Sequence, residues 1–309
     1  MTVKVLVAGD ANLDLILRGD TVPRFGQAEQ LLSGADLVLG SSAGIAAAGL
    51  ARLGVPTALV ARVGDDVFGA RTTELLGAAG VDVSEVRTVD EPTGLSVILS
   101  TTDDRAILTL IGALATLTGD EVLAAAEGAT HVHVASFFLL PALAADLPRV
   151  LATLKSRGVT TSLDTNWDPA ERWSGVEECL PHVDVLLPNA AEAVALAQSL
   201  GDEPADTEHA ARLLAQRGPL VVVKDGARGG LTVSGDEVVR APGLTLDVVD
   251  TTGAGDSFDA GFLASWLRGS PLPVAVRWGA VAGSLSTRGA GGTGGQARAE
   301  LGVQAARGS

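Results

Sequence analysis

The stretch that decides the fold of this chain is Asp250-Thr251-Thr252-Gly253-Ala254-Gly255-Asp256. The apolar segment 244–249 before it predicts a short strand, and the regular spacing of Phe258, Phe262 and Trp266 after it predicts a helix. A glycine-rich turn between strand and helix lets Gly253 and Gly255 adopt positive φ, so that successive N–H groups line one concavity at the helix N-terminus. We therefore expect this turn to hold a phosphate or a developing negative charge.

Asp256 falls at the start of the predicted helix. Asp is a common N-cap, because its carboxylate accepts hydrogen bonds from the unpaired N–H groups of the first turn. The turn by itself leaves a capping role and a functional role equally open. Other parts of the chain have to decide between them.

Composition limits the classes of protein that fit. The chain has 309 residues, 47% of them hydrophobic, which suits one large α/β core with a small appendage. Its net charge of -15 argues against nucleic-acid partners, because basic patches supply most of that affinity. Segment 128–145, the longest without acids, lysine or arginine, is interrupted by histidines and a proline, so we expect no membrane partner. The N-terminus lacks the pattern of a signal peptide, which predicts a cytoplasmic protein.

Cysteine and histidine give little support for a metal site. Cys179 is the single cysteine, which excludes an internal disulfide and a zinc site built mainly from cysteines. His131 and His133 face one side of a predicted strand, but no third ligand is clustered with them. We therefore favour a packed or strand-surface role for both histidines.

Apolar strands and helices alternate through most of the chain. The predicted strands are 3–8, 57–63, 131–135, 160–164, 183–187 and 220–224, and the predicted helices between them include 143–156, 192–200, 208–216 and one near Val176. This alternation predicts an α/β fold with a doubly wound, mostly parallel sheet and helices on both faces.

Two segments depart from the alternation and predict a small β-sheet lid. Segment 15–39 is irregular, and 92–111 reads as a hairpin around a turn at 102–104. We assign 15–39 and 92–111 to the lid, and 1–14, 40–91 and 112–309 to the α/β core.

Polar residues follow the first predicted strand. Asn12 and Asp14 lie two positions apart and project to the same side if the segment is extended. An amide and a carboxylate suit sugar hydroxyls, which both donate and accept hydrogen bonds. A plain polar turn is the alternative. Asp65 or Asp66, after a later strand, fits a helix N-cap equally well.

Two familiar nucleotide motifs do not apply. Segment 289–294 matches G-x-G-x-x-G, but a predicted helix precedes it and the chain ends at Ser309 without the acid that the motif needs. We expect a flexible loop there. The chain has no Gly-Lys dipeptide, so it contains no Walker A sequence.

Taken together, these features resemble the ribokinase-like, or PfkB, family of carbohydrate kinases, over essentially the whole chain. The motifs that carry the resemblance are 250–256, Asn189-Ala190-Ala191-Glu192, the strand and turn 223–230, Gly64-Asp65-Asp66, and the pair Asn12 and Asp14. The resemblance implies a ribokinase-like fold and ATP-dependent phosphorylation of a sugar or sugar-acid hydroxyl. A nucleoside kinase on the same scaffold is the first alternative, and a non-catalytic sugar-binding protein is the second.

The resemblance also implies a role for each matching residue. Asp256 becomes the base, and Gly253, Ala254 and Gly255 form the anion hole with it. The implied sugar-binding residues are Asn12, Asp14, Gly40, Ser41, Ile45, Arg105 and Asn166, and the implied nucleotide-binding residues are Asn189, Lys224, Gly226, Gly229 and Thr251. Glu192 would organise Mg²⁺ through water, and Asp250 would help to bind a monovalent cation such as K⁺. A homodimer formed through the β lid is a further hypothesis.

Three positions make the predicted site unusual. Ser41 stands where the family has a second glycine, and Ile45 stands where it has a sugar-contacting asparagine, so the pocket must differ from that of ribokinase. Asp168 replaces a basic residue of many relatives, which disfavours a phosphorylated sugar, although Arg105 can still meet one. We also expect the helix N-terminus to lower the pKa of Asp256 and keep the carboxyl ionised.

Overall fold

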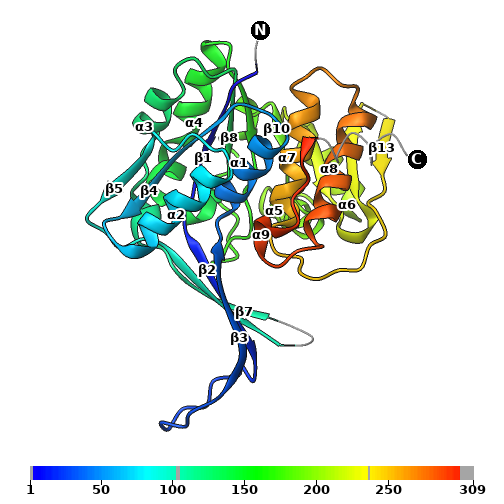
Figure 1. The fold of residues 1–309 in the computed structure, drawn as a ribbon. Helices are drawn as coiled ribbons and strands as arrows, with labels where there is room; N and C mark the ends of the chain where they lie inside the picture. The colour runs from blue at the N-terminus through cyan, green and yellow to red at the C-terminus, as the bar shows by residue number, and fades with distance from the viewer. Residues whose placement is uncertain (1–2, 102–104, 236, 300–309) are drawn as a thin grey trace.

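A nine-stranded sheet forms the centre of the computed structural model, which describes residues 3–101, 105–235 and 237–299 (Figure 1). Within these residues the strand order is β13-β12-β11-β10-β9-β8-β1-β4-β5. The strands are β1 (Val5–Ala8), β4 (Thr57–Gly64), β5 (Val86–Val89), β8 (His131–Val134), β9 (Thr160–Leu163), β10 (Val185–Leu186), β11 (Leu220–Lys224), β12 (Gly230–Ser234) and β13 (Glu237–Ala241). Neighbouring strands from β11 to β5 are parallel, and β12 and β13 add antiparallel pairs at one edge. The predicted mostly parallel sheet is confirmed.

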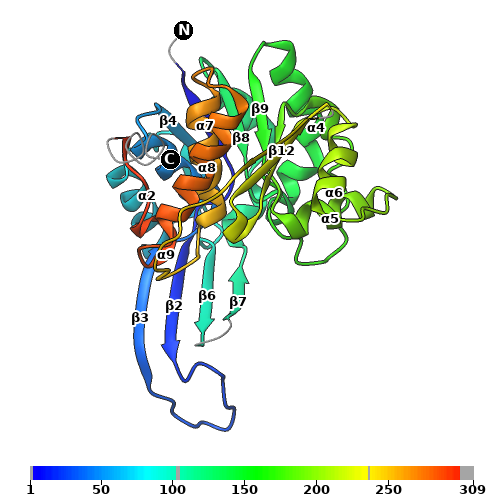
Figure 2. The same ribbon diagram turned by 90° about the vertical axis from the view of Figure 1, so that its right-hand side faces the viewer.

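Helices cover both faces of this sheet (Figure 2). One face carries α1 (Ser42–Arg52), α2 (Val67–Ala78), α7 (Ala254–Trp266) and α8 (Leu272–Ser286), and the other carries α3 (Gly119–Ala125), α4 (Pro141–Ser156), α5 (Ala190–Ser199) and α6 (Thr207–Ala215). In β1, Val5 and Val7 pack on the face that carries α1, α2, α7 and α8, and Leu6 packs on the opposite face. Alternate side chains of a strand point to opposite faces of the sheet. None of the helices in the described ranges is long and apolar enough to span a bilayer.

A separate four-stranded sheet projects from the carboxyl-terminal side of the main sheet and forms the lid (Figures 1 and 2). Its strands are β2 (Leu13–Gly19), β3 (Leu32–Leu39), β6 (Leu95–Ser100) and β7 (Arg105–Leu110), in the order β3-β2-β6-β7. The predicted hairpin is β6 and β7, and its turn at 102–104 lies outside the described residues. Because β2 begins at Leu13, Asp14 is part of a lid strand, although the sequence-based boundary places it in the core.

The strand expected at 244–249 does not form. The N–H of Leu244 donates to Oγ of Ser284 at 2.9 Å, and the N–H of Val249 donates to the carbonyl of Thr287 at 2.8 Å. These partners belong to α8 and its C-cap, so the segment is held by a helix and has no partner strand. The turn before α7 is therefore preceded by an irregular loop.

Two further differences concern local elements. No α-helix forms near Val176, where turns lead into a short 3₁₀ helix at Leu180–His182. The antiparallel strands β12 and β13 were not predicted, because the alternation rule describes only parallel crossovers. Asp66, by contrast, is the N-cap of α2 and accepts hydrogen bonds from Phe68 N at 3.0 Å and Gly69 N at 2.8 Å.

The two histidines of β8 are packed inside the protein, as predicted. His131 shares hydrogen bonds of 2.8 Å with Thr160 and with Ser162, and His133 shares one of 2.8 Å with Ser162. Burial lowers the pKa of His131 to about 3 and that of His133 to about 4. Both are neutral core residues. Cys179 is also buried.

Candidate active site

The candidate site lies at the carboxyl ends of the parallel strands around β1. The neighbours of β1 are β4 on one side and β8 on the other, so the winding of the sheet reverses there. Open α/β sheets bind ligands in the crevice at such a switch point. Asp10 follows β1, Ser136 follows β8 and Asp164 follows β9. The first turn of α7 completes this arrangement.

Helix α7 begins at Ala254, directly after a glycine in the left-handed conformation. Gly253 is the N-cap with φ 69°, and a Cβ on it would lie 2.6 Å from Cα of Gly292. Gly255 lies inside the helix without a positive φ, so only the first glycine has the predicted conformation. The capping role that the sequence left open for Asp256 is wrong, because Gly253 is the N-cap and Asp256 is the third residue of the helix. Its carboxyl is therefore available for chemistry.

A cavity of about 560 Å³ lies between this turn and the lid, and we call it the lid cavity. Its lining includes most of the predicted sugar-binding residues together with the start of α7. These are Asn12, Asp14, Ser41, Ile45, Arg105, Asn166, Thr252, Gly253 and Asp256. The fold thus brings together residues from both ends of the chain.

Asn12 and Asp14 form one polar corner of the lid cavity. Nδ2 of Asn12 donates to Oδ1 of Asp14 at 3.3 Å. Gly40 is not part of the lining, and a Cβ on it would lie 2.5 Å from Cγ of Asp14, so this glycine makes room for the carboxyl. Burial, followed by the nearby Asp10 carboxyl, raises the pKa of Asp14 to about 7. The corner can therefore donate or accept near neutral pH.

Ser41 has a structural task at the position of the missing glycine. It keeps a backbone with φ 66° and ψ 128°, which is strained for a residue with a Cβ. Its Oγ accepts a hydrogen bond from the N–H of Gly44 at 3.1 Å, so Ser41 is the N-cap of α1. The side chain compensates for the backbone strain by capping the helix.

Ile45 fills the space where the family has an asparagine. A Cβ on Gly292 would lie 2.7 Å from Cγ1 of Ile45, and a Cβ on Gly253 would lie 3.0 Å from its Cγ2. Ile45 therefore packs between the turn at Gly253 and α9 (Gly291–Gly294). Because α9 follows helix α8 and not a strand, the dinucleotide motif is excluded, but the expected flexible loop is a short helix.

Asn166 connects the ends of β8 and β9 with the start of α1. Its Oδ1 accepts a hydrogen bond from the N–H of Ser136 at 2.7 Å, and its Nδ2 donates to Oγ of Ser42 at 2.9 Å. The Ser42 hydroxyl lies near the carboxyl of Asp256 and acts to lower its pKa. Asn166 thus holds beside Asp256 a serine that the sequence did not reveal.

We expected Asp168 to disfavour a phosphorylated ligand, but its carboxylate does not line the lid cavity. Its Oδ1 accepts from the N–H of Ala170 at 2.8 Å, and its Oδ2 accepts from Arg172 at 2.8 Å and Trp173 at 2.7 Å. The carboxylate closes its own turn and is absent from the lining of the lid cavity. It therefore gives no reason to exclude a phosphorylated ligand.

A second cavity, of about 420 Å³, lies between the start of α7, α8 and the loop 244–248, and we call it the α8 cavity. Four of the five predicted nucleotide-binding residues line it, and Asn189 does not. The lining includes Lys224, Gly226, Gly229, Thr251, Ala254, Gly255, Leu246, Val248, Phe258 and Ala280. A mostly apolar wall next to the amides of a helix N-terminus suits a base and its phosphates.

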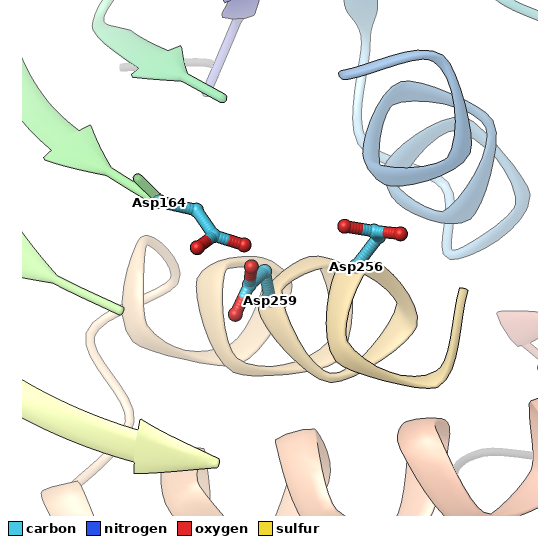
Figure 3. Close-up of side chains that lie close together, drawn as sticks. All are labelled: Asp164, Asp256 and Asp259. Carbon is cyan, nitrogen blue, oxygen red and sulfur yellow. The ribbon is translucent and has the colours of Figure 1, made fainter. Parts of the chain in front are cut away.

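Lys224 lies between two buried carboxyls. Its Nζ donates to Oδ2 of Asp164 at 2.6 Å and to Oδ2 of Asp259 at 3.1 Å. Figure 3 shows Asp164 and Asp259 turned toward each other, with Asp256 on the same helix as Asp259. Oxygens of the three carboxyls lie within 4.8 Å of one another, and the Lys224 ammonium bonds two of the three, Asp164 and Asp259. The ammonium thus already supplies a positive charge inside this cluster.

Asn189 and Glu192 bond each other's backbone at the start of α5. Oδ1 of Asn189 accepts from the N–H of Glu192 at 2.9 Å, and Oε2 of Glu192 accepts from the N–H of Asn189 at 2.8 Å. This is a capping box, which the N-x-x-E spacing alone explains. Burial raises the pKa of Glu192 to about 7. Such a group fits contact with Mg²⁺ through water better than direct ligation.

Asp250 organises the turn before α7. Its Oδ1 accepts from the N–H of Thr252 at 2.9 Å, and its Oδ2 accepts from the N–H of Gly291 at 2.9 Å. Burial acts against ionisation, but these amides hold the pKa of Asp250 below its usual range. The carboxylate thus ties the turn before α7 to α9.

Asp256 has a raised pKa, contrary to our expectation. Burial, followed by the charge of Asp164, raises the pKa of Asp256 to about 8, while Lys224 acts in the opposite direction. The carboxylate would lose its water among other acids, and this cost exceeds the effect of the helix N-terminus. The position of the carboxyl in the fold, and not the helix dipole, sets its protonation.

Sequence reasoning missed several polar groups of the site. Asp10 accepts hydrogen bonds from the N–H groups of Ala43 at 2.8 Å and Ser42 at 3.1 Å and thereby positions the start of α1. Asp10 lies two residues after a predicted strand, which was a usable signal. Asp259 lies three residues after Asp256, on the same helix face, which was another.

Comparison with known proteins agrees with this geometry. Residues 3–297 match the family described as pfkB family carbohydrate kinase. The chain belongs to this family. It is a carbohydrate or nucleoside kinase with a ribokinase-like fold, which confirms the predicted enzyme class and fold.

The relatives of this PfkB-family chain differ in the acceptors that their names give. An ATP-dependent ribose-1-phosphate kinase of Halopiger xanaduensis is 34% identical over 294 residues, covering 92% of either protein. A nucleoside kinase of Methanothermobacter thermautotrophicus is 29% identical, over 91% of this chain and 88% of that protein. The structure of Arabidopsis thaliana ribokinase with ribose and ATP has a TM-score of 0.86 and 26% identity, covering 100% of both chains. Similarity to these proteins thus defines the class of reaction, that of a kinase, but leaves the acceptor open.

Proposed function

We propose that this chain transfers the terminal phosphoryl group of ATP to a hydroxyl of a sugar or sugar acid. One observation carries the proposal: the lid cavity and the α8 cavity meet at a single turn. Gly253 and Asp256 line the first cavity, and Ala254 and Gly255 line the second. A hydroxyl held in the lid cavity and a phosphate held in the α8 cavity therefore face each other across the start of α7.

Asp256 is the proposed base. The hydroxyl oxygen forms a bond to the terminal phosphorus, the bond between that phosphorus and ADP breaks, and the hydroxyl proton passes to the Asp256 carboxylate. Phosphoryl transfer has a loose transition state and needs positioning more than a strong base. Ser42, held by Asn166, supplies that positioning.

The N–H groups of residues 253–256 form the proposed anion hole. They belong to the N-cap and first turn of α7, whose N–H groups have no partner within the helix. Fixed donors of this kind stabilise charge that develops on the transferred group without having to reorganise. The left-handed backbone of Gly253 makes this arrangement sterically accessible.

ATP and Mg²⁺ are the proposed cofactors. The apolar part of the α8 cavity suits the base, and Gly226, Gly229 and Thr251 line its polar part. Mg²⁺ usually keeps several waters and binds mainly to phosphates, which fits a water-mediated role of Asn189 and Glu192. When bound, Mg²⁺ neutralises phosphate charge that the net charge of -15 would otherwise repel.

A nucleoside acceptor is the second candidate. Trp167 lines the lid cavity and is 48% exposed, so its indole is available to a planar base. Phe137, by contrast, is buried, and Phe25 is 98% exposed. Trp167 is held edge-on by Trp173, with ring centroids 4.9 Å apart, which fixes the indole in place.

A sugar that already carries phosphate is a variant of the first proposal. Arg105 lines the lid cavity from β7, and Asp168 no longer argues against an anion there. The relative from Halopiger xanaduensis carries ribose-1-phosphate in its name. Arg105 is the residue that would meet such a phosphate.

An ADP-release assay tests the proposal. Purified protein with ATP and Mg²⁺ is offered ribose, fructose, sugar acids, ribose 1-phosphate and nucleosides, and Asp256→Asn serves as the inactive control. We expect ADP release with a sugar or sugar phosphate. Preference for nucleosides would replace the first candidate by the second. Binding of a sugar without ADP release would favour the non-catalytic alternative.

We further propose that the lid, 15–39 and 92–111, forms a homodimer through its outer face. On that face Leu37, Leu15, Val97 and Leu108 are paired in one row across the four strands. Leu37 is 41% and Leu108 60% exposed at the ends of this row. An apolar sheet face of this kind suits the same face of a second copy.

Activation by K⁺ is a separate proposal. It rests on Asp250 and on the resemblance of residues 287–290 to the monovalent-cation loop of the family. Asp250 holds this loop through Thr252 and Gly291. Turnover measured in potassium chloride and in choline chloride, at equal ionic strength, tests it. Equal rates would contradict a monovalent-cation requirement.

A further inference from the structure

We infer that Lys224 is a positioning residue whose ammonium, fixed between Asp164 and Asp259, shifts the Asp256 carboxyl toward its proton-accepting form. The inference rests on the proposed function, because it deepens the role of Asp256. It gives Lys224 an electrostatic task inside the protein, beside the contact of its stem with the α8 cavity.

The ammonium of Lys224 is fixed by its surroundings. Its bonds to Asp164 and Asp259 are 2.6 and 3.1 Å long, and the side chains are exposed by only 9% for the lysine and 1% for either acid. Turning the ammonium toward a nucleotide would leave two buried carboxyls without a cation. The charge is therefore held at one place whether or not a nucleotide is bound.

That place is directly beside the catalytic turn. A Cβ on Gly255 would lie 3.5 Å from Cδ and 3.7 Å from Nζ of Lys224, so the lysine passes along the backbone that precedes Asp256. Oxygens of Asp256, Asp164 and Asp259 lie within 4.8 Å of one another. One ammonium thus serves a group of three carboxyls.

The other charges that face Asp256 make this ammonium important. Among the described residues, the titratable groups around Asp256 and its cluster come from every neighbouring element. They are Asp10 after β1, Asp14 on β2, Arg105 on β7, His133 on β8, Asp164 after β9, Glu192 on α5, Lys224 on β11 and Asp259 on α7. Of these, Arg105 and Lys224 are the permanent cations, and Lys224 is the buried one.

The pKa of Asp256 depends on the positions of these charged groups. Burial and Asp164 raise the pKa of Asp256 to about 8, and Lys224 opposes them. Without the ammonium the carboxyl would keep its proton to higher pH, and a protonated carboxyl accepts no further proton. With Asp164 removed instead, the carboxyl would lose its proton at lower pH.

Direct titration of Asp256 tests this relation without any substrate. Protein labelled with ¹³C at the aspartate carboxyls is titrated by NMR, and the Asp256 resonance is identified by its loss in Asp256→Asn. We expect Lys224→Met to raise the titration midpoint by about one pH unit or more, a tenfold change in acidity. We expect Asp164→Asn to lower it. Midpoints that stay unchanged, or that move in the same direction, would overturn the inference.

Folding of the variants is controlled within the same set. The double variant Lys224→Met/Asp164→Asn removes an ion pair together, so it keeps the test open if Lys224→Met alone does not fold. We expect its midpoint to lie between those of the single variants. A double variant with the midpoint of Lys224→Met would contradict an electrostatic balance between the two groups.

The pH profile of kcat gives an independent readout. With an active acceptor, Lys224→Met should move the acidic limb of kcat to higher pH and change the KM for ATP by less than about threefold. A large rise of KM with an unmoved limb would make Lys224 a nucleotide ligand and overturn the inference. If the wild type releases no ADP with any acceptor, the proposed function fails, and the NMR titration still decides the inference.

Discussion

Arg105, on the lid strand β7, donates a hydrogen bond of 3.1 Å to Oγ1 of Thr252, in the turn before α7. A lid residue is thereby bonded to the turn that we propose as catalytic. Both residues also line the lid cavity. The position of the lid, the shape of the turn and the charge of the cavity are therefore linked through one side chain.

Replacing Arg105 distinguishes a neutral from a phosphorylated acceptor. Arg105→Gln should raise the KM of a sugar phosphate about tenfold or more, because a charge-assisted hydrogen bond is lost, and that of a neutral sugar far less. The exposed Arg24 of the lid, paired with Asp20, supplies the control Arg24→Gln, which should leave both KM values unchanged. Equal effects of Arg105→Gln on both acceptors would argue against contact with phosphate.

Removing the base should abolish most of the turnover. Asp256→Asn keeps the size of the side chain, so we expect kcat to fall by at least about 10²-fold while the fold is preserved. The exposed Asp65 provides the matched control Asp65→Asn, with kcat near that of the wild type. An Asp256→Asn protein with a nearly unchanged rate would contradict the assignment of the base.

Replacing Asp14, in the polar corner of the lid cavity, should change the KM of the acceptor and not that of ATP. Asp14 lines the lid cavity and is absent from the α8 cavity. Asp14→Ala should therefore raise the KM of the acceptor by about tenfold or more and leave the KM of ATP nearly unchanged. Steady-state kinetics with each substrate varied in turn measures both constants. A similar rise in both would show that Asp14 does not contact the acceptor.

The raised pKa of Asp256 predicts how stability depends on pH. Between its ordinary pKa of 3.8 and its folded value of about 8, the unfolded chain has lost this proton and the folded protein keeps it. The contribution of the Asp256 carboxyl to the free energy of unfolding is thus fully present below about pH 4, and it is lost as pH rises to about 8.

Asp256→Asn removes this dependence. Its free energy of unfolding should therefore exceed that of the wild type increasingly as pH rises, by up to about 1.4 kcal/mol per pH unit in this window. Urea unfolding at pH 5 and pH 8 compares the two proteins. If the two proteins differ in free energy of unfolding by the same amount at pH 5 and pH 8, the pKa of the Asp256 carboxyl is not raised in the folded protein.

An acidic residue on the outer face of the lid should prevent dimer formation. Leu108→Asp places a charge in the apolar row of Leu37, Leu15, Val97 and Leu108. Light scattering after gel filtration should give twice the 31.2 kDa chain mass for the wild type and the single mass for the variant. Val274→Asp, at a 44% exposed valine of α8, should remain dimeric. A monomeric wild type would refute the dimer.

Local sequence determined the framework of this protein. Val5, Leu6, Val7 and Ala8 had to form a strand buried on both faces, because no side of that segment is polar. The spacing of helices and strands then left a doubly wound sheet, and the glycine turn marked the start of α7, where we propose that an anion binds. Asn12, Asp14 and Asp256 were found in the same way, from their positions beside these elements.

Only the tertiary structure decided how these groups behave. Lys224 bonds Asp164 and Asp259, which lie 60 and 35 residues away in the chain, and the burial of Asp256 reverses the pKa shift that its helix predicts. Asp168 turned its carboxylate to its own backbone, which its position in the sequence did not reveal. Periodicity is a local property, whereas desolvation and charge depend on residues that meet only when the chain folds. The sequence therefore located the candidate site, and the fold set the protonation of Asp256.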